Sequence, residues 1–176
     1  MLSINYFYED IDFFIYNYKK ISNFLFNIIK KELFNFNIEY FNSYFINTDY
    51  LISKKINKVF FKKKIKFKSI NLNFIFCSDC YLNKTNIKYL NSNKLTDIIA
   101  FDNSGFYKSI QGDIYISIDR VSRNSFYYSV GFQKELFRVV LHGLLHLLGY
   151  NDKSFFLKKK MDIKESEYLK IFLNYK

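Results

Sequence analysis

Hydrophobic and polar positions alternate along several short segments, and this alternation predicts β-strands. Residues 69–76 (SINLNFIF) switch between apolar and polar side chains at every second position, which is typical of a strand with one buried face. Shorter runs predict further strands at residues 3–8, 97–101 and 113–118. The chain should therefore contain a small β-sheet.

Longer segments have the three-to-four residue spacing of helices. Residues 19–32 predict an amphipathic helix, and further helices are expected at 79–89, 119–128, 132–148 and 154–173. The first of these helices is expected to bury Ile21, Phe24, Leu25, Ile28 and Ile29. The last is expected to make apolar contacts through Phe155, Leu157, Met161, Tyr168, Ile171 and Phe172.

Strands and helices mixed in this order predict the α+β class, with a small mixed β-sheet packed with helices. The length of 176 residues suits a single domain spanning residues 1–176. Residues 35–66 fit this pattern least, because many aromatic residues are followed there by the run KKINKVFFKKKIKFK. This segment is either an insertion into the domain or a basic arm.

The formal net charge of +11, from 27 Lys+Arg and 16 Asp+Glu, favours a polyanionic partner. The basic stretches 54–68 and 158–160 are candidates to follow an RNA backbone, and the interleaved Phe60, Phe61 and Phe67 are candidates to stack on bases. Lysine codons are also rich in A and T, however, and alternating Lys and Phe equally describe a half-buried strand. The second interpretation is slightly favoured.

Several features indicate the cellular setting. No apolar stretch is long enough to cross a bilayer, and the N-terminal MLSINYFYEDIDFF lacks the basic region of a signal peptide. Cys77 and Cys80 are spaced C-x-x-C without the second pair that a zinc ribbon needs, so both are interpreted as reduced thiols. We expect a cytoplasmic protein with no membrane partner.

The candidate chemistry lies on the predicted helix 132–148, whose second half is apolar on almost every side and should be buried. This helix carries His142 and His146, which are the only two histidines of the chain. A separation of four residues places both rings on one helix face, within reach of a single ion. The alternative is a pair of core histidines that are satisfied by hydrogen bonds.

The residues after this helix complete a ligand pattern. Gly149 is suited to end the helix, and Asp152 follows just beyond the turn. The positions of the two histidines, the glycine and the aspartate match the metzincin pattern H-E-x-x-H-x-x-G-x-x-H, with a carboxylate as the third ligand. Three protein ligands leave a fourth position for water, so we predict one catalytic Zn²⁺ per chain, held by His142, His146 and Asp152. No organic cofactor is expected.

The zincin-like helix departs from that pattern at one position. In zincin peptidases the residue after the first histidine is the glutamate that acts as general base, and here it is Gly143. The sequence therefore keeps the metal ligands of a peptidase but not its base.

Three ordered blocks of sequence resemble a known family. The segment HGLLHLLGYND (142–152) is similar to the signature H-G-x-L-H-L-x-G-Y-D-H of the YbeY family of rRNA maturation factors. Upstream, TDIIAF (96–101) and GDIYIS (112–117) resemble that family's blocks T-D-V-L-S-F and G-D-I-x-I-S. The resemblance covers residues 70–155 well.

This resemblance implies a zinc-dependent endoribonuclease that acts on single-stranded RNA. It implies a role in rRNA processing, including the 3′ end of the small-subunit rRNA, and in ribosome quality control, with the ribosome or its small subunit as partner. Two positions differ from the family. Its third ligand is usually His, where this chain has Asp152, and its RNA-contacting Arg falls at Leu90, with Lys88 and Lys94 nearby.

His142 and Arg138 are the candidate catalytic residues. Arg138 lies one turn before His142 on the same helix face, where it could stabilise negative charge on a phosphate, or instead pair with Glu135. Asp97 and Asp113 are candidate hydrogen-bond partners of the histidines, or else cap turns.

Two other functions stay open. One is a metallopeptidase with a different base. The other is a non-catalytic, zinc-containing ribosome-assembly factor that binds rRNA through its lysines. A basic membrane-surface protein is a weaker third possibility, because no strongly amphipathic helix with a lysine face is visible.

Overall fold

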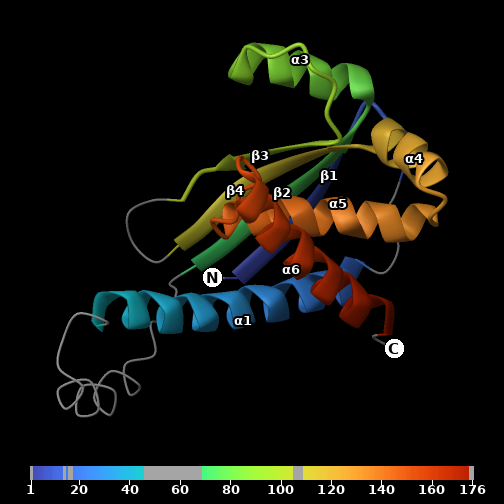
Figure 1. Cartoon of the computed structure of the whole chain (residues 1–176). Helices are drawn as coiled ribbons and strands as arrows, with labels where there is room; N and C mark the ends of the chain where they lie inside the picture. The colour runs from blue at the N-terminus through green and yellow to red at the C-terminus, as the bar shows by residue number, and fades with distance from the viewer. Residues whose placement is uncertain (1, 14, 16–17, 46–68, 105–108, 175–176) are drawn as a thin grey trace.

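The computed structural model describes residues 2–13, 15, 18–45, 69–104 and 109–174. Four strands and five helices lie in this part of the chain (Figure 1). In chain order they are β1 (Leu2–Glu9), α1 (Tyr18–Phe45), β2 (Ser69–Cys77), α3 (Asp79–Leu90), β3 (Ile98–Asp102), β4 (Ser109–Ser117), α4 (Ile118–Tyr127), α5 (Phe132–Leu147) and α6 (Phe155–Asn174).

The described strands form one mixed sheet in the order β1-β2-β4-β3. β1, β2 and β4 run parallel, with Ile4 opposite Leu72 and Leu72 opposite Gly112, whereas β3 runs antiparallel to β4. The predicted α+β class with a small mixed sheet is confirmed.

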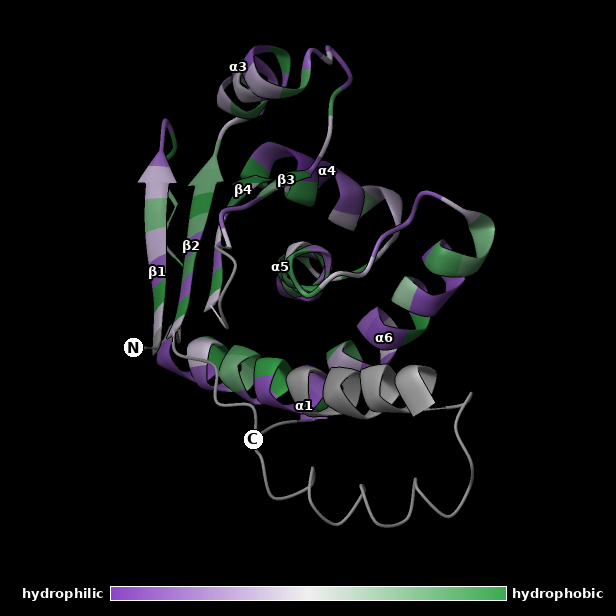
Figure 2. Cartoon of the chain, turned by 90° about the vertical axis from the view of Figure 1, so that its left-hand side faces the viewer, coloured by the Kyte–Doolittle hydropathy of each residue, from purple (hydrophilic) through white to green (hydrophobic). Residues whose placement is uncertain are grey.

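Helices cover both faces of the sheet. Figure 2 looks along α5 and shows it enclosed by the sheet, α1, α4 and α6. Ile114 and Ile116 of β4 are fully buried on the α5 side, while Tyr115 between them packs with Leu82 of α3 on the other side. The period of two along a strand therefore divides the interior into a large core around α5 and a small one under α3.

The predicted strands are confirmed, although β4 begins earlier than expected, at Ser109. The helix predicted at 19–32 is also confirmed, and its five apolar residues are buried in the large core. This helix is longer than predicted, because α1 continues to Phe45 through the first part of the segment 35–66. Residues 46–68, with the basic stretch and its three phenylalanines, lie outside the described residues, so the insertion stays a prediction.

The expected packing of the last helix is only partly correct. Met161 and Tyr168 of α6 are buried and Phe172 packs against the core, but Phe155, Leu157 and Ile171 are exposed. The first turn of α6 lies at the outer end of the helix, on the side of the fold opposite β1 and β2 (Figure 2). Despite these exposed apolar residues, no helix in the described part of the chain has the length and apolarity to span a membrane.

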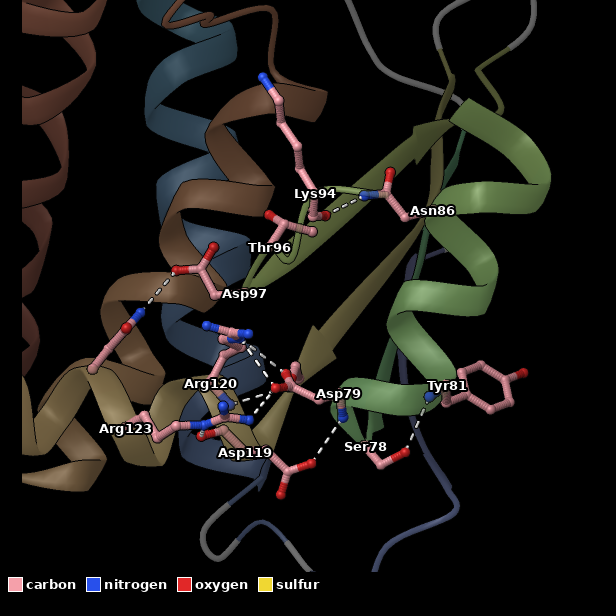
Figure 3. Close-up of polar contacts among 12 residues, drawn as sticks. Ser78, Asp79, Tyr81, Asn86, Lys94, Thr96, Asp97, Asp119, Arg120 and Arg123 are labelled. Atoms are coloured by element: carbon pink, nitrogen blue, oxygen red, sulfur yellow. Dashed lines mark hydrogen bonds and ion pairs between the residues drawn. The ribbon is translucent and has the colours of Figure 1, made fainter. Parts of the chain in front are cut away.

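Two helices begin together at the carboxyl ends of β2 and β4 (Figure 3). The carboxylate of Asp79 accepts a hydrogen bond from the Ser117 hydroxyl at 2.5 Å and pairs with Arg120 and Arg123. In return, Asp119 accepts a hydrogen bond from the backbone N–H of Asp79 at 2.8 Å. Each acidic side chain thus satisfies donors at the start of the other helix, which fixes α4 and the entry to α5.

Candidate metal centre

Helix α5 lies close against the sheet because glycines stand at the contact. A Cβ added at Gly143 would lie 2.5 Å from Cδ1 of Ile98 and 2.7 Å from Cγ2 of Ile114. A Cβ at Gly112 of β4 would lie 2.6 Å from Cδ1 of Leu147. Real Cβ atoms do not approach this closely, so a side chain at either position would displace its neighbours, and the two glycines allow α5 to lie close to β3 and β4.

The two histidines of this part of α5 contact α6 and the turn that follows α5. The Nε2 atoms of His142 and His146 are 3.0 Å apart. Nδ1 of His142 is 2.5 Å from Oε1 of Glu165, and Nδ1 of His146 is 3.2 Å from the carbonyl oxygen of Tyr150. Each ring therefore has its outer nitrogen held by an oxygen acceptor and its inner nitrogen directed at the other ring.

The identity of these acceptors determines which nitrogens carry protons. A carbonyl oxygen only accepts, so Nδ1 of His146 donates to Tyr150, and a carboxylate likewise receives the proton on Nδ1 of His142. When both rings are neutral, two Nε2 lone pairs then face each other, an arrangement that a shared cation would stabilise. Burial, and to a lesser extent the neighbouring His142, lowers the pKa of His146, which favours the neutral form that binds metals.

The turn after α5 brings a carboxylate to the same place. Gly149 has a φ of +90°, its N–H donates to the His146 carbonyl at 3.0 Å, and the N–H of Tyr150 donates to the Leu145 carbonyl at 3.0 Å. This pair of bonds is the Schellman motif that closes a helix, and it reverses the chain so that Asp152 returns. One ligand atom from each of His142, His146 and Asp152 lies within 4.8 Å of the others.

This donor set is suitable for a metal ion. Two neutral imidazoles and one carboxylate are ligands that zinc accepts, and three protein ligands leave a position open. The two histidines are half-buried and Asp152 is exposed, so the open side faces solvent. A His/His/Asp site that can hold a metal is thus present where the sequence predicted it.

Glu165 was not predicted from the sequence, although in the described part of the chain it is the carboxylate closest to the histidines. It lies on α6, 23 residues beyond His142, and is buried in the stripe that also contains Met161 and Tyr168. An acidic residue within an otherwise apolar helix face was the available signal, since a buried charge needs a partner.

Asp97 and Asp113, which the sequence offered as partners of the histidines or as turn caps, have other hydrogen-bond partners in the structure. Asp97, shown in Figure 3, accepts a hydrogen bond from Asn124 of α4 at 3.4 Å. It also accepts one from Arg138 of α5 at 3.3 Å, so it joins the residue before β3 to both helices. Asp113 accepts hydrogen bonds from the Asn73 side chain at 2.7 Å and the Asn103 side chain at 3.0 Å, across the sheet. Both carboxylates join strands and helices and make no contact with an imidazole.

Arg138 is surrounded by carboxylates. It donates two hydrogen bonds to Glu135, at 2.9 and 2.8 Å, so the alternative role given to it from the sequence is confirmed. Its guanidinium is also 3.3 Å from Asp97 and 3.6 Å from Glu165. The hydrogen bonds to Glu135 raise the pKa of Arg138 further above its ordinary value. Arg138 therefore reaches His142 indirectly, through Glu165.

Gly143 explains why the site has no peptidase-type base. A Cβ added to Gly143 would lie closer than van der Waals distance to the side chains of Ile98 and Ile114 in the sheet. A glutamate at this position would require Ile98 and Ile114 to move before its side chain could be placed. The close packing of α5 against the sheet thus disfavours a base at this position.

The remaining candidate residues lie apart from the histidines in the fold. Leu90 is the last residue of α3, on the other face of the sheet from α5, and is exposed, as are Lys88 and Lys94. Cys77 and Cys80 are free thiols, one buried and one exposed, as expected. Burial, assisted by nearby carboxylates, raises the pKa of Cys77 to about 12.

Comparison with known proteins identifies the family. The family model described as Endoribonuclease YbeY matches residues 37–173. The Endoribonuclease YbeY of Amoebophilus asiaticus is 52% identical over 100 residues, covering 57% of this chain and 68% of that protein. The protein of the same name from Flavobacterium psychrophilum is 50% identical over 101 residues, covering 57% and 71%.

A solved structure also aligns with the chain. The solution structure of TM1509 from Thermotoga maritima covers 96% of this chain and 89% of its own, with a TM-score of 0.49 and 20% identity. The assignment rests on the family model and the sequence relatives: this chain belongs to the YbeY family.

Proposed function

We propose that this protein is a zinc-dependent endoribonuclease that cuts single-stranded RNA. One observation carries the proposal: the Nε2 atoms of His142 and His146 face each other at 3.0 Å, with both outer nitrogens held by acceptors and Asp152 alongside. A site of this kind in a chain of the YbeY family, whose relatives carry the name endoribonuclease, supports metal-assisted hydrolysis of a phosphodiester.

We further propose that the substrate is ribosomal RNA. The protein would act in the cytoplasm on the ribosome or its small subunit, in rRNA maturation that includes the 3′ end of the small-subunit rRNA, and in ribosome quality control. The net charge of +11 supports a polyanionic substrate, because cationic surfaces displace the counterions of a nucleic acid.

His142, His146 and Asp152 would hold the zinc ion. When bound, zinc supplies a water of lowered pKa and polarises a phosphoryl oxygen. Glu165 fixes the tautomer and direction of the His142 ring, and the Tyr150 carbonyl does the same for His146. Because these acceptors come from α6 and from the turn after α5, the site is in place before substrate binds.

Arg138 would contribute charge in one of two ways. About a third of its side chain is exposed, so it could face the negative charge that builds up on the phosphate. Its contact with Glu165 at 3.6 Å supports a positioning role instead, in which Arg138 holds the carboxylate against His142. The partners of Arg138 favour the second role.

The test is cleavage of a labelled single-stranded rRNA fragment by the purified protein, with the same sequence as a duplex for comparison. Wild type should contain about one zinc and cut only the single strand, and EDTA should abolish cleavage until zinc is restored. His146→Ala should lose both zinc and cleavage. Glu167→Gln, a change on the exposed side of α6, should keep both.

A wild-type protein that holds zinc and binds RNA without cutting it would contradict the enzyme assignment and support a ribosome-assembly factor. Cleavage of casein rather than RNA would support a metallopeptidase. The packing of Gly143 against the sheet argues against the peptidase, because the usual position of its base is occupied by Ile98 and Ile114.

A further inference from the structure

The first two turns of α6 carry an exposed aromatic and basic surface, which we name the α6 edge. Phe155 and Phe156 are 77% and 82% exposed, and their rings contact each other with centroids 5.9 Å apart. Lys158, Lys159 and Lys160 follow directly and are exposed as well. The α6 edge consists of these five residues.

The exposure of the two rings follows from how α6 packs. The helix meets the core through Met161, Glu165 and Tyr168, which begin a turn and a half beyond the phenylalanines. The preceding part of α6 has no core beneath it. Leaving a phenylalanine in water forgoes about 1.5–3 kcal/mol of burial, so packing against the core does not account for either ring.

The α6 edge adjoins the candidate metal centre. Asp152 precedes Phe155 by three residues, a stretch of chain that spans at most about 11 Å. Ser154 lies between them and caps the helix, because its hydroxyl accepts from the N–H of Leu157 at 3.4 Å and its carbonyl from the N–H of Lys158 at 2.9 Å. The cap fixes where the first turn of α6 begins, and with it the position of the backbone that carries both rings relative to Asp152.

We propose that the α6 edge binds the single-stranded RNA substrate, with bases next to the cut phosphate stacked on Phe155 and Phe156. Lysines on the same helix faces neutralise the phosphates of the stacked nucleotides. At a spacing of three and four residues, Lys158 and Lys159 lie beside Phe155, and Lys159 and Lys160 lie beside Phe156. The proposal rests on the proposed function, and it names the contacts that make that function selective. Bases of a duplex are already stacked within it, so only an unpaired strand offers faces to these rings.

A second exposed aromatic cluster provides an internal control. Phe126 and Tyr127, at the end of α4, are 89% and 80% exposed, comparable to the phenylalanines of the α6 edge. This cluster precedes the start of α5, whereas the histidines and the α6 edge belong to the other end of that helix (Figure 1). Since α5 has 16 residues, the two ends are separated by about 24 Å.

The experiment compares wild type, F155A/F156A and F126A/Y127A. Affinity for a fluorescent single-stranded RNA is measured by anisotropy on EDTA-treated protein, and KM and kcat are measured on zinc-loaded protein. We expect F155A/F156A to weaken Kd and raise KM about 10- to 100-fold, with zinc content unchanged and kcat changed much less. F126A/Y127A should stay within about twofold of wild type, and F155Y/F156Y, which keeps the aromatic faces, should restore binding.

Stacking is tested directly with RNAs that lack one base at successive positions. Abasic sites near the cut should weaken binding to wild type but not to F155A/F156A, because the ring and the base lose the same contact. The proposal would be overturned if the abasic site and F155A/F156A weakened RNA binding additively. It would also be overturned if F155A/F156A and F126A/Y127A lost equal RNA affinity, or if the Kd of F155A/F156A were unchanged.

The outcomes separate this proposal from the proposed function. If wild type cuts RNA and F155A/F156A cuts it with the same KM, the α6 edge fails and the endoribonuclease stands. If wild type never cuts but only F155A/F156A loses RNA affinity, the α6 edge stands and the enzyme fails. If wild type instead binds vesicles of phosphatidylserine and phosphatidylcholine through these rings, with RNA affinity unaffected, the surface is a membrane contact and the proposal is overturned.

Discussion

Replacing Glu165 by glutamine tests whether the candidate metal centre is organised as the geometry indicates. Glu165 is 7% exposed, with Oε1 2.5 Å from Nδ1 of His142 and Oε2 3.6 Å from the guanidinium of Arg138. Glutamine has nearly the same shape but no charge. It also offers one acceptor oxygen in place of two, so it cannot face a donor on both sides.

The expected loss follows from these two contacts. A charge-assisted hydrogen bond is roughly twice as strong as a neutral one, so the bond that orients His142 weakens even if the amide oxygen faces the ring. The amide nitrogen then faces Arg138, where two donors meet. Removal of a hydrogen-bond partner from a metal-binding histidine typically weakens metal affinity by about 10- to 100-fold, which corresponds to about 1.4–2.7 kcal/mol.

The assay is competition for Zn²⁺ between the protein and a chelating dye, which reports affinity without depending on turnover. The control is Glu167→Gln, two residues further along α6, which removes an exposed ion pair with Lys31 at 2.7 Å. An exposed pair contributes about 0–1 kcal/mol and does not reach the histidines, so zinc affinity should not change. Unfolding of both variants in EDTA checks that α6 stays packed.

The reasoning is refuted if Glu165→Gln binds zinc as tightly as wild type while remaining folded. An equal loss in Glu165→Gln and Glu167→Gln would also refute it, because the effect would then reflect the general charge of α6 and not the bond to His142.

Three further changes probe the surroundings of the site. Gly143→Ala should lower the free energy of unfolding in EDTA by up to about 2 kcal/mol, because an overpacking cost of about 1–3 kcal/mol outweighs the helix gain of about 1 kcal/mol. In the control Gly131→Ala, no atom lies within 4 Å of the added Cβ, so the free energy of unfolding should change by less than about 0.5 kcal/mol. Equal stabilities of the two variants would contradict the packing of Gly143. A disulfide reagent at pH 8 should react with one thiol of the native protein, the exposed Cys80, and with two thiols after denaturation. The reason is that Cys77 is buried and has a pKa of about 12. Fast reaction of two thiols in the native protein would contradict this prediction. Burial opposes ionisation of Glu32, but three hydrogen bonds outweigh it and lower the pKa of this carboxyl. The contribution of Glu32 to folding stability is therefore present above the unfolded pKa and is lost as pH falls below about 4.5. The free energy of unfolding of Glu32→Gln, measured from pH 6 to 3, should accordingly fall less steeply than that of wild type.

The part of the site that could be predicted from the sequence depends on local geometry. Four residues of helix bring His142 and His146 together, and a glycine with positive φ reverses the chain toward Asp152, whatever the rest of the fold does. The strands were predictable for the same reason, since alternation along a segment reflects one buried face. Short-range rules thus sufficed for the three candidate ligands.

The groups that orient the ligands depend on tertiary packing and were missed or misassigned. Glu165 reaches His142 only because α6 crosses α5 at that level, and no spacing along the chain reports such a crossing. Asp97 was a candidate partner of the histidines, yet the fold directs it to Arg138. The same limit applies to Phe155: periodicity identified the apolar positions of α6, but it does not show where the core beneath the helix ends.

The position after the first histidine connects the fold to the class of substrate. In this chain it is Gly143, pressed against the sheet, and the neighbouring carboxylates Glu165 and Glu135 are engaged by His142 and Arg138. Peptide hydrolysis by a zincin needs a base at that position to take a proton from water. Attack on a phosphodiester depends above all on stabilising negative charge, which a metal ion and nearby cations supply. A metal centre without that base, next to the exposed lysines at the start of α6, therefore favours an anionic substrate over a peptide.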